Sequence, residues 1–595
     1  MRGPIFRLFA ALAAIFVFCS LAVASGEPQI LPLSQIQPGM KGVGYTIFSG
    51  NNVQPFDVEV IGVLPNLIGP KQDVVLVRLS SPEIAKSGVV DGMSGSPVYI
   101  NGKLAGAIAY KFGSFTSEAL AGMTPIEEEL AVSDLAKPGA SRKTRVANAA
   151  AEGSHYEMPD SLTREVGLGR GVFLEPIAAP LAFSGFLPSV IGRYSGELEK
   201  YGMMATEGGS VPASPSDANL QPGEMAAIVL VSGDSSVTAG CTVTARIGDQ
   251  VYLCGHSLFG FGKVNLAMAR AHVVATLPSA MNSTKIMNAG GLIGSIGEDL
   301  LTGVMGSIGP AAAMIPVELA VETPDMTKRF HFEVAENSKL TPLLVSMVTL
   351  NGVQGNLAYN DTNTFQLDGS IDIAGHSPVH LENMFAPNDQ QISGAAPIAA
   401  QVQATFGEIF HNPFEQPHIT AIRLAVHSVP NARWAAIDSA WSDRKEAHPG
   451  ETIAIKVALR PYRGAPILRE VPLVIPSQTE PGTLHILVSD AATLDRVEQY
   501  FPLGPSTRVT GLQQLIDLLN QERQNDRLYV TLLQPAPTLL VEDKRLPDVP
   551  LSEINVLSQR NPGRTTVLWQ SELAEQSVPL HEVITGHEYL TITVK

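Results

Sequence analysis

The sequence has little charge and no long basic stretch. Of its 595 residues, 16% are charged and 45% are hydrophobic, which indicates a packed protein rather than a disordered one. The formal net charge is −17, and no run of Lys or Arg follows the first few residues. Proteins that bind nucleic acids carry basic patches, so no nucleic-acid partner is expected.

Motifs of several other classes are missing as well. There is no His-Glu-x-x-His, and a proline within residues 376–380 spoils the helical spacing of the two histidines there, so no metal site is expected. The glycine-dense stretch 290–306 is not followed by Gly-Lys-Ser/Thr, which argues against a phosphate loop. No fixed-period repeat is present, and no cofactor is expected.

Long apolar runs are absent after the N-terminus. Residues 1–24 have the pattern of a secretory signal peptide: Arg2 and Arg7, an apolar run over residues 8–23, and a small-x-small cleavage site at residues 22–24. No later stretch is long and apolar enough to span a bilayer. We therefore expect an exported protein, periplasmic or extracellular, with no stable membrane span after signal cleavage.

Cysteine is scarce, with three residues in the chain. Cys19 lies in the signal region, and Cys241 and Cys254 flank an expected β-hairpin. In an oxidising compartment the hairpin pair fits a disulfide, and two buried thiols fit equally well.

Glycine and proline, by contrast, are plentiful, at 53 and 43 residues. This composition suits many short strands with frequent turns, so the expected fold is mainly β. One helix stands out, because the leucines and isoleucine of residues 512–519 fall on one face. The expected units are a signal peptide (1–24), a serine-bearing β unit (28–133), a linker (134–164), a histidine-bearing β unit (165–325), a β-rich region (326–425) and an immunoglobulin-like and α/β C-terminal region (426–595).

The most informative stretch is residues 91–98, Asp-Gly-Met-Ser-Gly-Ser-Pro-Val. It follows an apolar strand and precedes a hairpin that turns at Asn101 and Gly102. The glycines on either side of Ser94 allow backbone N–H groups to converge, as acyl-transfer enzymes require. The stretch is either a plain turn between strands or the loop of a nucleophilic serine.

A serine nucleophile needs a base, and histidine is the usual one. Most of the 13 histidines stand singly in polar surroundings. His256 differs, because it follows the expected cysteine hairpin in a Cys-Gly-His-Ser sequence whose small neighbours would leave the ring free. We take it as the candidate base.

These residues resemble a known family. The segments at 55–62, 75–79 and 92–110 closely resemble the C-terminal part of the stage IV sporulation protein B (SpoIVB) serine peptidase family, including its Gly-Met-Ser-Gly-Ser-Pro element. The segments 240–244 and 253–256 resemble the Leu-Gly-His part of that family. The resemblance implies a trypsin-like double β-barrel that cleaves protein or peptide substrates.

Two departures from the family follow. Its histidine segment precedes the serine segment, whereas here Ser94 precedes His256, so the halves are permuted. The position of its catalytic aspartate is Ser81 here. Glu83, Asp91 or Asp299 could orient the histidine instead, and Asp299 is favoured because it lies in the histidine half.

The resemblance implies acyl-enzyme chemistry. Ser94 would attack the scissile carbonyl, His256 would take and return the proton, and the N–H groups of Gly92 and Ser94 would form the oxyanion hole. Ser96 is the rival nucleophile, although a small residue before the proline strand suits a structural role. A serine esterase is disfavoured, because Ser94 precedes a strand and no Gly-x-Ser-x-Gly elbow occurs.

Two functions remain open at this point. One is an exported serine endopeptidase whose C-terminal β domains bind substrate or an envelope protein partner. The other is a non-catalytic binding or scaffold protein of the cell envelope that keeps the peptidase fold. The serine loop and His256 favour the first, and the serine at position 81 favours the second.

Overall fold

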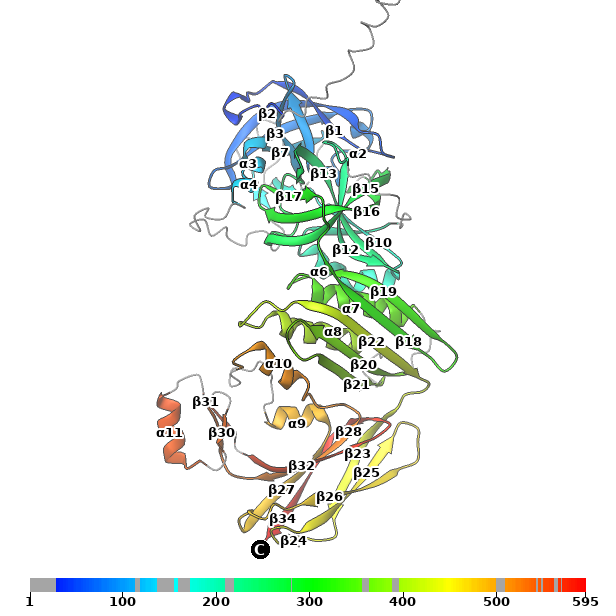
Figure 1. Cartoon of the computed structure of the whole chain (residues 1–595), viewed down its shortest axis with the longest axis vertical. Coiled ribbons are helices and arrows are strands. Elements are labelled where there is room, and N and C mark those ends of the chain that lie inside the picture. The colour runs from blue at the N-terminus through cyan, green and yellow to red at the C-terminus, as the bar shows by residue number, and fades with distance from the viewer. Residues whose placement is uncertain are drawn as a thin grey trace, which may run out of the picture.

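The computed structural model describes residues 28–112, 118–135, 155–158, 172–208, 219–279, 281–355, 363–387, 395–498, 509–541, 544–546, 549–560, 565–568 and 570–595. The expected signal peptide and most of the expected linker lie outside these ranges. The chain is mainly β, as the composition predicted. Two barrels lie at one end, a β-sandwich lies at the other, and a helix-covered sheet lies between them (Figure 1).

The serine half forms a closed barrel of six strands. Their order is β5-β1-β2-β3-β7-β6, and pairing of β5 with β6 closes the ring. In β2 the side chains alternate between core and solvent, with Phe56 and Val58 buried and Asp57 exposed. The bounds are Lys41–Thr46 (β1), Gln54–Gly69 (β2), Gln72–Ser80 (β3), Ser96–Ile100 (β5), Lys103–Phe112 (β6) and Leu120–Pro125 (β7), with η2 at Leu33–Gln35 and the short helices Ile84–Ser87 (α2), Ile126–Leu130 (α3) and Val132–Leu135 (α4).

The histidine half forms a second closed ring of six strands. Their order is β13-β14-β17-β16-β15-β12, and pairing of β12 with β13 closes it. The expected double β-barrel is therefore present. The bounds are Met225–Gly233 (β12), Ser236–Ile247 (β13), Gln250–Leu253 (β14), Gly262–Leu277 (β15), Ser283–Leu300 (β16) and Gly303–Ile308 (β17).

Short strands join the two barrels. Strand β4 (Val90–Asp91), just before Ser94, pairs with β16 of the second barrel. Strand β9 (Phe173–Pro176) pairs with β6 of the first barrel, and β10 (Ala179–Ser184) pairs with β13 of the second. The segment from β9 to β10, here called the connection, thus passes from one barrel to the other beside the serine loop. Strands β8 (Tyr156–Glu157) and β11 (Met203–Glu207) flank it, with helix α6 at Pro188–Glu199.

The region expected to be β-rich at 326–425 also contains two long helices. Its strands, in the order β19-β18-β22-β20-β21, continue the second barrel's sheet through β12, and α7 and α8 pack together against it. Residues 341–353 of α7 are buried on every side, so the helix lacks the polar face that would have indicated it in the sequence. The bounds are Met314–Glu322 (β18), Thr327–Ala335 (β19), Thr341–Gln354 (α7), Thr364–Ile373 (β20), Val379–Phe385 (β21), Ala395–Phe410 (α8) and Ile419–Val429 (β22).

The C-terminal region contains two sheets that share one hydrophobic core. Their orders are β26-β25-β23-β33 and β24-β34-β27-β28-β32, and a small sheet β30-β29-β31 lies beside α11. The helix expected at residues 512–519 is confirmed as α10, whereas the immunoglobulin-like connectivity stays a prediction. The bounds are Trp434–Ser442 (β23), Glu446–Ala447 (β24), Thr452–Pro461 (β25), Ile467–Val474 (β26), Gly482–Ser489 (β27), Ala491–Glu498 (α9), Leu512–Leu519 (α10), Arg527–Gln534 (β28), Thr538–Val541 (β29), Lys544–Leu546 (β30), Leu551–Arg560 (α11), Thr565–Leu568 (β31), Ser571–Pro579 (β32), Val583–Thr585 (β33) and His587–Val594 (β34).

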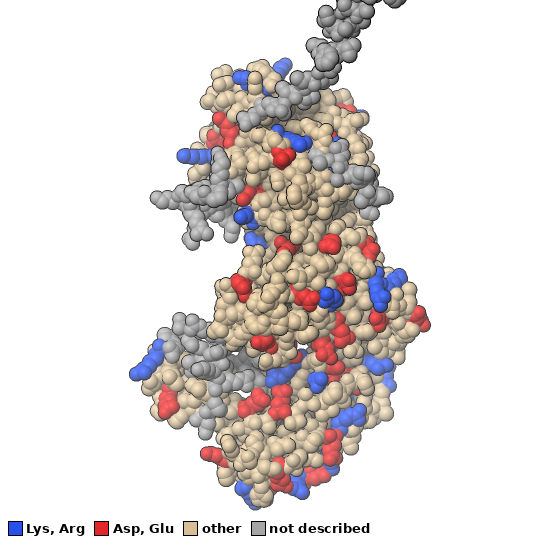
Figure 2. Space-filling view, viewed as in Figure 1, with Lys and Arg blue, Asp and Glu red and all other residues tan. Residues whose placement is uncertain are grey.

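The surface carries both signs of charge. On the face drawn in Figure 2, Lys and Arg are scattered among Asp and Glu, and the described residues form no continuous basic area there. Within the described part of the chain, no helix is long and apolar enough to cross a membrane.

Candidate active site

Ser94 lies in a tight loop between β4 and β5. The flanking glycines, Gly92 and Gly95, have φ of +93° and +91°, a conformation that L side chains rarely adopt. A Cβ atom at Gly95 would lie 2.0 Å from the carbonyl oxygen of Thr242. Glycine is therefore needed both for the turn and for the close approach to the second barrel.

Strand β13 of the second barrel holds the serine loop through hydrogen bonds. The Thr242 N–H donates to the Ser94 carbonyl at 2.9 Å, and the Thr242 hydroxyl donates to the Gly92 carbonyl at 2.9 Å. The Thr244 hydroxyl donates to the Gly95 carbonyl at 2.8 Å. The loop of one barrel is thus fixed by the other.

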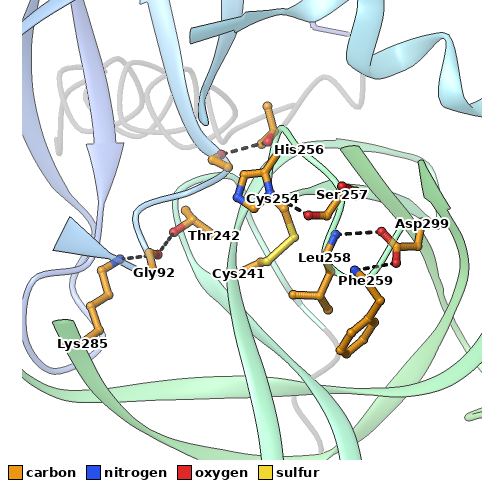
Figure 3. Close-up of a disulfide and its surroundings, with 12 residues drawn as sticks. Gly92, Cys241, Thr242, Cys254, His256, Ser257, Leu258, Phe259, Lys285 and Asp299 are labelled. Atoms are coloured by element: carbon orange, nitrogen blue, oxygen red, sulfur yellow. Dashed lines mark hydrogen bonds between the residues drawn. A yellow bond between two sulfur atoms is a disulfide. The ribbon is translucent and has the colours of Figure 1, made fainter. Parts of the chain in front are cut away.

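A tight turn and a disulfide position the histidine. Cys254 and Gly255 have φ of +69° and +68°, and the chain turns sharply after β14. Cys241 and Cys254 are joined in a disulfide with a Cα–Cα distance of 5.1 Å, which is one of the two alternatives that the sequence left open (Figure 3). The Thr124 hydroxyl donates to the Gly255 carbonyl at 2.6 Å, so the first barrel also holds this turn.

His256 is buried in the form that a general base requires. Its Nδ1 lies 2.7 Å from the Ser257 carbonyl oxygen, which can only accept, so the ring proton is on Nδ1 (Figure 3). Its Nε2 is buried and has no hydrogen-bond partner among the described residues. Burial lowers the pKa of His256 below 6.5, although carbonyl groups partly oppose this. The imidazole is therefore neutral at pH 7, with its lone pair on Nε2.

The two serines of the loop differ in their partners. The Ser96 hydroxyl donates to the Met93 carbonyl at 2.6 Å, as expected for a structural side chain. The Ser94 hydroxyl is buried, and it has no partner within the described ranges. Among these residues no hydrogen bond joins Ser94 Oγ to His256 Nε2.

The serine loop nevertheless meets the histidine turn directly. A Cβ atom built on Gly95 would lie 2.6 Å from the backbone nitrogen of Cys254. Ser94 is one residue from this contact, and His256 is two residues from it. The fold thus brings together two segments that are separated by about 160 residues in the sequence.

Asp299 lies behind the histidine loop, and its carboxylate binds backbone amides. Its oxygens accept hydrogen bonds from the N–H groups of Leu258 at 2.7 Å and Phe259 at 2.8 Å (Figure 3). Burial raises the pKa of Asp299 to about 6, and these amides act in the opposite direction. The His256 Nδ1 bonds to the Ser257 carbonyl, so Asp299 orients the loop that carries the ring.

Of the other two candidate acids, one is paired with a lysine and the other directly precedes a short helix. Asp91 is buried and accepts a hydrogen bond from the Lys111 ammonium at 2.8 Å, and burial raises its pKa while Lys111 lowers it. Glu83 is the residue before helix α2, where the Ser81 hydroxyl accepts the Ile84 N–H at 3.0 Å. Ser81, which the resemblance aligns with the family's aspartate, therefore caps a short helix.

Two buried titratable groups near the site were missed in the sequence. The Lys285 ammonium donates to the Thr46 hydroxyl at 2.8 Å and to the Gly92 carbonyl at 3.1 Å, and burial lowers its pKa to about 7. Glu129 is fully buried beside Thr244 and Gly255, and burial raises its pKa to about 8. No local sequence signal distinguishes these two from surface charges, because their burial depends on the opposite barrel.

The predicted oxyanion donor at Gly92 has a partner. Its N–H donates to the Ala178 carbonyl, in the connection between β9 and β10, at 3.1 Å. A cavity of about 280 Å³ lies beside this connection, and its lining includes Tyr110, Ile177 and His256. Within the described residues, no group of three or more His, Cys, Asp or Glu side chains could hold a metal ion.

A double β-barrel that holds a serine loop of one barrel against a histidine turn of the other has the architecture of a class of serine hydrolases. The comparison with protein families agrees: the family model described as SpoIVB peptidase S55 matches residues 23–122. This match confirms the resemblance over the serine half. No curated protein and no solved structure matches the chain. The matched segment includes Ser94 and ends before His256, and the catalytic roles of both residues stay predictions.

Proposed function

We propose that this chain is an exported serine endopeptidase of the SpoIVB type, with Ser94 as nucleophile and His256 as general base. The observation that carries the proposal is a pair of atoms at the junction of the barrels, Ser94 Oγ and His256 Nε2, that have no hydrogen-bond partner among the described residues. Buried polar atoms normally have hydrogen-bond partners, and exceptions require an explanation. A catalytic role explains both exceptions, because the serine hydroxyl and the imidazole nitrogen would find their partners when a substrate binds.

The proposed reaction follows from the tautomer of His256. Ser94 Oγ attacks the scissile carbonyl while Nε2 takes the hydroxyl proton, which then passes to the leaving amine. Water, deprotonated by the same nitrogen, hydrolyses the acyl-enzyme and restores Ser94. The Ser257 carbonyl stabilises the imidazolium by accepting a hydrogen bond from Nδ1–H. In most serine peptidases a carboxylate accepts this bond.

The remaining groups position this pair. Asp299 fixes the loop after His256, and the disulfide fixes the turn before it. Lys285 and Thr242 hold the Gly92 carbonyl, which fixes the backbone of the serine loop. The N–H groups of Gly92 and Ser94 would stabilise the oxyanion once the Ala178 carbonyl has moved away.

A fluorophosphonate probe tests the proposal. It should label the full-length protein, and Ser94→Ala should abolish labelling. Ser96→Ala is the matched control, since it removes a buried hydroxyl from the same loop, and it should still be labelled. His256→Ala should slow labelling by about 100-fold or more, the usual contribution of a general base. A folded protein in which Ser94 is labelled at no pH between 5 and 9, even after a substitution that loosens the contact between Gly92 and Ala178, would rule out serine catalysis.

A non-catalytic binding or scaffold protein of the cell envelope is the second candidate. Two observations favour it: the Gly92 N–H is already bonded to Ala178, and Ser81 stands where the family has its aspartate. In that case the C-terminal sheets would bind an envelope protein, and the barrels would serve as a scaffold. The same labelling experiment separates the two functions.

A further inference from the structure

The connection between the barrels extends the sheet of the serine barrel. Strand β9 adds to β6 in antiparallel register, with Pro176 opposite Tyr110 and Glu175 opposite Lys111. The Ile177 N–H continues this ladder by donating to the Ala109 carbonyl at 2.9 Å. Adding an extended peptide to a sheet edge is a common mode of peptide recognition.

The edge of β6 that pairs with β9 lies next to the loop of Ser94. The Gly95 N–H donates to the Ile108 carbonyl at 2.8 Å, and the next carbonyl along β6, that of Ala109, accepts from Ile177. The serine loop and the connection therefore bind neighbouring carbonyls of one strand. A peptide that lies along β6 at this point lies beside Ser94.

The next residue, Ala178, binds the serine loop itself. Its carbonyl accepts the Gly92 N–H at 3.1 Å, and its own N–H lies beside the buried Asp91 carboxylate and lowers the pKa of that group. Pro180 packs on Gly92, because its Cγ atom is 3.1 Å from the position of a Cβ there. The Ala178 carbonyl is therefore bonded to the Gly92 N–H. In the proposed reaction this N–H would bind the oxygen of the scissile carbonyl.

We infer that residues 173–178 occupy the path of the substrate, as an internal strand that keeps the site closed. The inference rests on the proposed function and deepens it. The substrate is then an extended polypeptide that pairs with β6 in place of β9 and presents its scissile carbonyl to Gly92. Regulation follows from the same geometry, because anything that draws the connection away from β6 opens the site.

Loosening the internal strand should activate the serine. Ile177 is fully buried in the core of the serine barrel, so Ile177→Ala removes packing that holds the strand in place. Ile100→Ala is the matched control, since Ile100 is buried in the same core but lies outside the connection. Ile177→Ala should raise the rate of fluorophosphonate labelling at least tenfold over the wild type, and Ile100→Ala should not.

A binding measurement tests the strand without catalysis. A fluorescein-labelled peptide with the sequence of residues 173–178, Phe-Leu-Glu-Pro-Ile-Ala, is added to full-length Ser94→Ala protein and followed by fluorescence anisotropy. It should bind the Ser94→Ala/Ile177→Ala protein at least tenfold more tightly than Ser94→Ala or Ser94→Ala/Ile100→Ala. A scrambled peptide should bind none of them.

The two measurements separate the inference from the proposed function. Equal labelling of the Ile177→Ala and Ile100→Ala proteins, together with equal peptide affinities, would overturn the internal strand. Peptide binding that depends on Ile177→Ala, with no labelling of any variant, would support the internal strand and refute the serine chemistry.

Discussion

The buried carboxyl of Glu129 should make the free energy of unfolding depend on pH, by an amount that follows from its raised pKa. Its side chain is fully buried in helix α3, and neither carboxyl oxygen has a hydrogen-bond partner among the described residues. Burial raises its pKa from 4.5 to about 8. Between these values the unfolded chain is ionised there while the folded chain is protonated, so this group lowers the free energy of unfolding as pH rises.

The magnitude is about 1.4 kcal/mol for each pH unit in that window, and about 5 kcal/mol over the whole shift. Glu129→Gln replaces the carboxyl with a group of similar shape that does not titrate. The stability of the variant relative to the wild type should therefore rise by about 1.4 kcal/mol per unit between pH 5 and 8. With a urea slope of about 2 kcal/mol per molar, the difference in midpoint grows by about 0.7 M per pH unit.

Urea unfolding followed by near-ultraviolet circular dichroism measures the change. The three tryptophans, Trp434, Trp441 and Trp569, all follow the barrels in the sequence, so their fluorescence reports the C-terminal region as an internal control. Glu127→Gln is the matched substitution, because Glu127 is exposed on the same short helix. A midpoint difference for Glu129→Gln that does not change with pH would refute the assignment of a buried, protonated carboxyl.

Three further outcomes follow from the geometry of the site. The rate of labelling of Ser94 should fall at low pH with a midpoint below 6.5, because burial lowers the pKa of His256. A midpoint above 6.5 in the measured pH profile would contradict this. Asp299→Asn should slow labelling by about tenfold without moving that midpoint, since the carboxylate binds loop amides and not the ring; a shifted midpoint would show direct contact with the imidazole. Replacing both Cys241 and Cys254 with alanine should lower the free energy of unfolding in urea by about 3 kcal/mol, as expected for a disulfide that closes a loop of this length, and should slow labelling. Unchanged stability would show that the disulfide does not constrain the hairpin.

Much of the serine barrel could be predicted from the sequence. The Asn101–Gly102 pair predicted the hairpin that joins β5 and β6. Residues 56–60 alternate between apolar and polar side chains, which is typical of a strand with one buried face, and β2 buries Phe56 and Val58. The helix at residues 512–519 was found because its apolar residues repeat along one face. Helix α7 was missed for the opposite reason, since a helix buried all round has no polar face.

The candidate site was predictable in part. Gly92 and Gly95 flank a serine for reasons of local backbone geometry, and such geometry can be inferred from neighbouring residues. The hydrogen bond between Gly92 and Ala178 could not be inferred, because it depends on where the chain returns 86 residues later. The same holds for Asp299, the favoured of three candidates for orienting the histidine, which binds amides of the loop that carries the ring.

The sequence by itself determined the strands, the serine loop and the histidine turn, because steric limits on glycine and the two-residue repeat of a strand act between near neighbours. Only the tertiary structure decided which titratable side chains are buried, as with Lys285 and Glu129, since desolvation is imposed by the opposite barrel. It also decided that Ala178 bonds the Gly92 N–H. That contact depends on the packing of two barrels and on the path of the chain between them, which no local pattern encodes.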